Sequence, residues 1–173
     1  MNVSKSLLFL ALAGVSGAAG ASDAQAPEPA AFVKKAAQAG MTEVEAGRVA
    51  LAKSQDPSIR SFAERMVADH GKANSELASL ASAKGIDAPK ELDAEHKAML
   101  AALSAKSGSE FDREYSQHMN MDHDKAIALF ESAAKSPDKD LSSFAKKTLP
   151  TLKQHRQLAE KLPGKMPAAP AGG

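Results

Sequence analysis

Apolar side chains recur every three or four residues along most of this chain, the spacing of one face of an α-helix. The pattern predicts long helices over residues 29–53, 57–84, 108–135 and 137–162, and a shorter helix over residues 89–106. Alternating runs of β-branched and aromatic residues, which are typical of strands, are scarce. The sequence therefore predicts an all-α fold, a four-helix bundle with an extra short crossover helix.

Helix-start signals support these boundaries. The pairs Asp-Pro at residues 56–57 and Ser-Pro at residues 136–137 each place a capping residue before a proline at the first helical position. Ser107 with Glu110 three residues later matches a capping box. Pro150 lies inside the last predicted helix, where it is expected to remove one hydrogen bond and bend the helix axis.

The two ends of the chain differ from this core. Lys5 followed by an apolar stretch and the A-x-A pattern at residues 19–21 indicates a signal peptide cleaved near Ala21, too short for a membrane span. We therefore expect a periplasmic or secreted protein: a signal peptide over residues 1–21, a flexible lead over 22–30, a helical bundle over 31–162 and a disordered Pro/Gly/Ala tail over 163–173. We expect no transmembrane segment in the mature chain.

Charge and cysteine content narrow the class of partner. The formal net charge is +1, and removal of residues 1–21 takes away Lys5 and no acidic residue, so the mature chain is close to neutral. A near-neutral chain does not favour nucleic acid as a partner. The chain contains no cysteine, so an exported form relies on its core rather than on disulfides. Envelope proteins are the partners we expect, and the oligomeric state stays open.

The halves of the chain resemble each other. The segment "AKSQDPSIRSFA" aligns with "AKSPDKDLSSFA", and the alignment places His70 near His155 and Glu43 opposite His123. Each of the four long helices then presents one polar group at a similar depth. Bundles build metal sites in this way, from side chains on facing helices.

Glu43, His70, His123 and His155 are therefore our candidate metal ligands. Imidazole with carboxylate suits one transition metal ion, and zinc, copper, iron and nickel all remain open. The alternative is that these side chains are core residues that hydrogen-bond to the backbone. Met66 and Met119 lie one helical turn before two of the histidines, and thioethers favour Cu(I), but methionine at this spacing is more often core filler.

Other polar residues are expected around the ligands rather than among them. Asp69 and Asp122 directly precede histidines, so they project about 100° away around the helix and are predicted to bond a neighbouring helix or to orient an imidazole from outside. Tyr115, the only tyrosine, is predicted to be a core aromatic near the site. His96 and His118 are predicted to be peripheral.

Three stretches carry a resemblance to a known family. Residues 32–81, the segment "GSEFDREYSQHMNMDHDKAIALFESAAK" and the segment "FAKKTLPTLKQHRQLAEKL" resemble the bacterial domain-of-unknown-function family 4142, through the motifs M-x-x-D-H, F-D-x-x-Y and T-L-P-x-L-x-x-H. The family implies a ferritin-like bundle and an exported or outer membrane protein, without an established activity. The sequence departs from ferritin-like di-iron proteins, whose Glu-x-x-His pairs are replaced here by Val67, Asn120 and Leu152 three residues before the histidines.

Three functions follow from these observations. The first is an exported, non-enzymatic helical bundle that binds a transition metal or protects the envelope under stress. The second is a metal-dependent oxidoreductase of ferritin-like type, which needs an open coordination position and a path for substrate. The third is a structural or partner-binding bundle without metal. We see no catalytic triad and no glycine-rich phosphate loop in the sequence, so an enzyme is the less favoured class.

Overall fold

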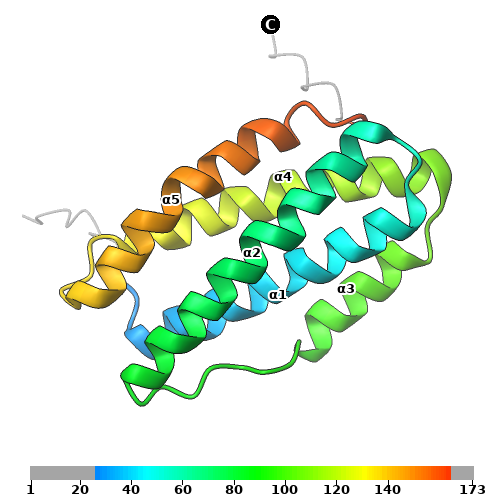
Figure 1. The fold of residues 1–173 in the computed structure, drawn as a ribbon. Helices are drawn as coiled ribbons and strands as arrows, with labels where there is room; N and C mark the ends of the chain where they lie inside the picture. The colour runs from blue at the N-terminus through cyan, green and yellow to red at the C-terminus, as the bar shows by residue number, and fades with distance from the viewer. Residues whose placement is uncertain (1–25, 165–173) are drawn as a thin grey trace, which may run out of the picture.

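The computed structural model describes residues 26–164, and these form five helices (Figure 1). They are α1 (Pro29–Lys53), α2 (Pro57–Ala83), α3 (Ala94–Ser104), α4 (Gly108–Ala133) and α5 (Lys139–Ala159). The described residues contain no strand. The predicted signal peptide and most of the predicted tail lie outside them.

Two antiparallel helix pairs build the bundle. α1 packs most extensively on α2, α4 packs on α5, and the pairs meet through α1 against α4 and α2 against α5. A long connection leaves the end of α2 and leads to α3, which lies against α1 and α4 (Figure 1). The predicted four-helix bundle with a short crossover helix is confirmed.

α1 and α2 start at the predicted Pro29 and Pro57, and the cap of α2 agrees with the prediction in detail. The Asp56 side chain accepts hydrogen bonds from the backbone N–H groups of Ser58 and Ile59 at the start of α2. Pro150 lies inside α5, which continues past it to Ala159. The end of α2 is also as expected, since Gly85 follows it with a φ of 65°, a conformation that glycine adopts without strain.

The predicted start of α3 and the predicted cap of α4 need correction, although α4 itself starts at the predicted Gly108. α3 begins at Ala94 rather than Pro89, because the Asp93 side chain caps it by accepting from His96 N–H. The predicted capping box at Ser107 is wrong: its side chain makes no cap hydrogen bond, and Glu110 pairs with Lys106 instead.

α5 also starts later than the Ser136-Pro137 signal predicts. Its cap is Asp138, whose side chain accepts from the backbone N–H groups of Asp140 and Leu141. Ser136 accepts a hydrogen bond from Asp138 N–H one step earlier. A carboxylate two residues beyond the serine thus replaces it as the cap.

The core is divided into two apolar clusters. One contains Phe32, Phe130 and Phe144, and the other contains Phe62, Phe111 and Tyr115. On α2, α4 and α5 a buried histidine lies between the residues that belong to one cluster and those that belong to the other, and on α1 Glu43 has that place. A polar layer therefore crosses the bundle near its middle.

Close contact between α1 and α2 requires small residues. A Cβ atom on Gly47 would lie 3.0 Å from the Ala63 carbonyl oxygen and 3.0 Å from Cγ2 of Val67. The same atom on Gly40 would collide with the Asn74 side chain. This tight packing fixes the depth of Glu43, which lies between the two glycines on α1.

Across residues 26–164, we find no helix that combines the length and the apolar character needed to cross a membrane.

Candidate metal centre

Three helices bring His70, His123 and His155 together at the middle of the bundle. Each side chain is buried, with at most 8% of its residue surface exposed. The ring centroids are 5.6 Å apart for His70 and His123, 5.3 Å for His70 and His155, and 5.5 Å for His123 and His155. One ring nitrogen from each histidine lies within 4.8 Å of those of the other two. Small side-chain rotations would let all three contact one ion at the usual bond length of about 2.0–2.1 Å.

Hydrogen bonds fix which nitrogen of His123 and His155 carries a proton. Nδ1 of His123 lies 2.7 Å from the Met119 carbonyl oxygen, which can only accept, so this nitrogen donates. Nε2 of His155 lies 2.8 Å from Oδ2 of Asp69 and donates to that carboxylate. The opposite nitrogen of each neutral ring then carries a lone pair.

Three of the four other ring nitrogens lack partners among the described residues. Nε2 of His70, Nε2 of His123 and Nδ1 of His155 are buried and make no hydrogen bond to any of the described residues. An unpaired buried polar atom costs about 1–3 kcal/mol, and native structures contain few of them. Three such atoms on histidines that lie this close together point to a group that the imidazoles could bind.

The histidines are neutral over the physiological pH range. Burial, followed by the proximity of His123 and His155, lowers the pKa of His70 to about 3. Burial lowers the pKa of His123 to about 4, against the opposing effect of its bond to Met119. Burial also lowers the pKa of His155, although the hydrogen bond to Asp69 acts in the other direction. Neutral imidazoles with free lone pairs are the form that binds metal ions.

Glu43, the fourth predicted ligand, lies beside this cluster but is not a member of it. Its Oε1 is 3.9 Å from Nδ1 of His123, and its Oε2 is buried without a partner among the described residues. Burial, followed by the charge of Asp122, holds the pKa of the Glu43 carboxyl well above its usual range. Because the carboxyl and the imidazole both favour their neutral forms, their contact is not a strong ion pair. Whether Glu43 binds metal stays a prediction.

The residues predicted to surround the ligands occupy three different environments. Asp69 orients His155 from the protein surface, as a carboxylate behind a metal-binding imidazole does. Asp122 lies in the middle of α4 with a partly exposed side chain, and its Oδ1 is 3.3 Å from Nζ of Lys125. Tyr115 is buried between Phe62 and Phe111, with a hydroxyl that has no partner among the described residues.

The two histidines predicted to be peripheral and the two methionines predicted to fill the core have those places in the structure. His96 contacts Asp93 on α3, and His118 contacts Glu114 on α4, and neither belongs to the central cluster. Met66 and Met119 are buried in the apolar cluster that contains Tyr115.

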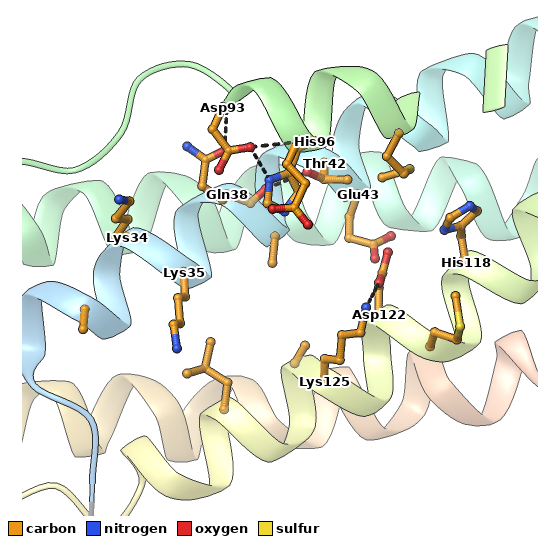
Figure 2. Close-up of a pocket in the computed structure, with 17 residues that line it drawn as sticks. Lys34, Lys35, Gln38, Thr42, Glu43, Asp93, His96, His118, Asp122 and Lys125 are labelled. Carbon is orange, nitrogen blue, oxygen red and sulfur yellow. Dashed lines mark hydrogen bonds and ion pairs between the residues drawn. The ribbon is translucent and has the colours of Figure 1, made fainter. Parts of the chain in front are cut away.

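A cleft of about 740 Å³ opens between α1, α3 and α4 (Figure 2). Figure 2 shows the carboxyl groups of Glu43 and Asp122 turned towards each other in this cleft. A smaller pocket of about 30 Å³, called the inner cavity below, adjoins the cleft, and His70 and His123 form part of its wall. Sequence patterns do not reveal either space, because the cleft depends on where the long connection places α3.

The donor set suits one metal ion and does not suit a di-iron centre. Di-iron bundles bind their metals through four glutamates and two histidines. Here three imidazoles meet with one nearby glutamate, and Asp69 is engaged with His155. Three histidines with a fourth position left open are a known arrangement for zinc.

Comparison with known proteins agrees with this fold. The family model described as a domain of unknown function, DUF4142, matches residues 15–162. The structure is similar to the crystal structure of a DUF305 fragment from Deinococcus radiodurans, with a TM-score of 0.69 and 18% sequence identity. The match covers 78% of this chain and 93% of that chain, and it shows likeness of fold. The search of curated proteins gave no match.

Proposed function

Since this chain belongs to the DUF4142 family, whose function is unknown, we propose a role from the site itself: it is a metal-binding bundle that holds one transition metal ion through His70, His123 and His155. The observation that carries the proposal is the set of three buried ring nitrogens without partners. Histidines that served only as core residues would be expected to have both ring nitrogens satisfied.

The surroundings of each ligand support a metal rather than a bound water alone. His123 and His155 each donate their other nitrogen to a fixed oxygen, which orients the ring and raises its basicity. Three neutral imidazoles leave a bound divalent ion with its full charge. Glu43 lies beside His123 and is the candidate for a fourth ligand. If a bound ion displaced the proton that burial favours on this carboxyl, the resulting carboxylate would offset part of the charge of the ion.

The role we infer is binding rather than catalysis. Burial of all three histidines keeps a bound ion away from large substrates, and zinc, copper, iron and nickel are the candidate ions. We further propose that the protein acts in the cell envelope, because residues 1–21 have the pattern of a signal peptide. Mass spectrometry of a periplasmic fraction would support this with a mature chain that starts at Ser22.

Thermal unfolding after chelation, followed by addition of Zn²⁺, Cu²⁺, Fe²⁺ or Ni²⁺ one at a time, tests the proposal. An ion at a hundred times its dissociation constant should stabilise the fold by about 2.7 kcal/mol and raise the melting temperature. We expect the rise for at least one ion and expect His123→Ala to abolish it, because this variant removes one of three ligands.

Two variants serve as matched controls. His96→Ala and His118→Ala remove histidines outside the cluster and should keep the full metal-dependent rise. No rise with any of the four ions, or an equal loss in these controls, would contradict a metal site at the cluster.

A further inference from the structure

The outer cleft and the inner cavity share part of their walls. Ala39, Glu43, Asp122 and Ala126 line both spaces. The cleft opens to solvent between α1, α3 and α4, and the inner cavity is lined by His70 and His123. These four side chains therefore lie between the cleft and the pocket that His70 and His123 line.

Two of the four shared residues carry a carboxyl group. Glu43 is 4% exposed, and its Oε2 is buried without a partner among the described residues. The Asp122 side chain is 23% exposed and has Lys125 at 3.3 Å on its solvent side. The two groups thus extend from the cleft surface to the wall of the inner cavity, and Figure 2 shows them facing each other.

Two other surface hollows among the described residues offer less. A hollow beside Met41 and Gly71 shares only Asn74 with the inner cavity, and the Asn74 side chain packs against Gly40 there. A hollow beside Arg65 and Lys161 shares no residue with the cavity. Neither brings a carboxyl group to the cavity wall.

Building on the metal site proposed above, we propose that metal ions reach the histidines through the cleft between α1, α3 and α4, and that Asp122 and Glu43 form a transient cation-binding site at its floor. Carboxylate oxygens can replace the water molecules bound to a divalent ion as it enters the protein. Asp122 binds the ion first. Glu43 binds it next, and the ion then passes Ala39 and Ala126 to reach the inner cavity. Lys125 competes with the ion for Asp122.

An entrance and a ligand have different kinetic signatures. A group that acts only on the path changes the association and dissociation rates by the same factor, so the dissociation constant is unchanged. A group that holds the bound ion changes the dissociation constant. Stopped-flow measurements with Zn²⁺ and with Cu²⁺, each released to or taken from a fluorescent chelator, separate these effects on the full chain.

Asp122→Asn should slow both rates about tenfold, which is the lower end of the gain that charged clefts give to association. Lys125→Gln should speed both rates, because it frees Asp122. Asp124→Asn is the matched control: it removes a carboxylate two residues away on α4 that pairs with Arg156 rather than lining the cleft. Ala126→Leu narrows the passage from the cleft to the inner cavity without any change of charge. It should therefore slow both association and dissociation.

Glu43→Gln tests the inner carboxyl. Equal slowing of association and dissociation places Glu43 on the path, and a faster dissociation with unchanged association makes it a permanent ligand and overturns its transient role. Unchanged association and dissociation rates in Asp122→Asn and Ala126→Leu would overturn the proposed entry path. They would leave the proposed metal site unaffected. Absence of metal binding in the wild-type chain overturns the proposed function itself, so the two failures are distinguishable.

Discussion

At the scale of single residues, the unusual feature is a group of three buried histidines, each with one ring nitrogen that has no partner among the described residues. The helical stripes predicted that His70, His123 and His155 face inward at one depth, and the structure places them together. The bond between His155 and Asp69 joins residues on α5 and α2. The sequence could suggest that Asp69 orients an imidazole, but not which one, because that depends on how the helices are rotated against each other.

Replacing His70 with leucine should stabilise the metal-free protein. The change removes a buried nitrogen without a partner, whose cost is about 1–3 kcal/mol, and replaces it with an apolar side chain of similar size. Urea unfolding after chelation measures the change. The same variant should lose its metal-dependent stabilisation, so stability and binding move in opposite directions.

A decrease in the stability of metal-free His70→Leu would contradict this expectation. It would mean that the imidazole makes a favourable contact that leucine cannot replace. His96→Leu is the matched control, since His96 lies outside the core and contacts Asp93.

At the scale of helices, the sequence predicted which segments are helical better than it predicted where they start. α1 and α2 start as predicted because each has a proline at its first helical position, and α4 also starts at the predicted Gly108. α3 and α5 start later than predicted because Asp93 and Asp138 supply the capping oxygens. Several nearby residues could cap each of these starts, and packing against the rest of the bundle selects among them.

The contact between α1 and α2 gives a prediction at this scale. Gly47→Val should destabilise the protein by about 1–3 kcal/mol, because the new side chain has no room against the Ala63 carbonyl and Val67. Gly71→Val is the matched control on α2, since a Cβ atom there meets nothing within 4 Å.

Thermal unfolding of both variants measures the difference. The control should be close to neutral or slightly stabilising, because valine has a somewhat better helix propensity than glycine. Equal effects of the two substitutions would show that helix propensity rather than the close approach of α1 and α2 decides the outcome.

At the scale of the whole molecule, the polar layer links stability to pH. The folded pKa values of His70 (about 3) and His123 (about 4) lie below the ordinary value of 6.5, and that of His155 is also lowered. The unfolded chain therefore binds more protons than the folded chain below pH 6.5. Each histidine lowers the free energy of unfolding by up to about 1.4 kcal/mol for each pH unit of acidification below that value.

Glu43 acts in the opposite direction. Its folded pKa is raised above 4.5, so over the window above that value the folded chain holds a proton that the unfolded chain has lost. Acidification within this window therefore favours folding through Glu43 and offsets part of the histidine effect. In the metal-free protein, stability should fall from pH 6.5 to pH 4.5, and Glu43→Gln should make the fall steeper.

Urea unfolding at a series of pH values measures how the free energy of unfolding changes with pH in the wild type and in Glu43→Gln. Parallel curves for the wild type and Glu43→Gln would show that the carboxyl ionises alike in the folded and unfolded chains.

The division of the core has a consequence for cooperativity. The two apolar clusters lie on either side of a layer that, without an ion, contributes little attraction of its own. We therefore expect that one half of the bundle can open while the other stays closed, as contiguous segments do in native-state hydrogen exchange. An ion held by α2, α4 and α5 would tie both halves to the same centre, so a single bound atom would turn two weakly coupled folding units into one.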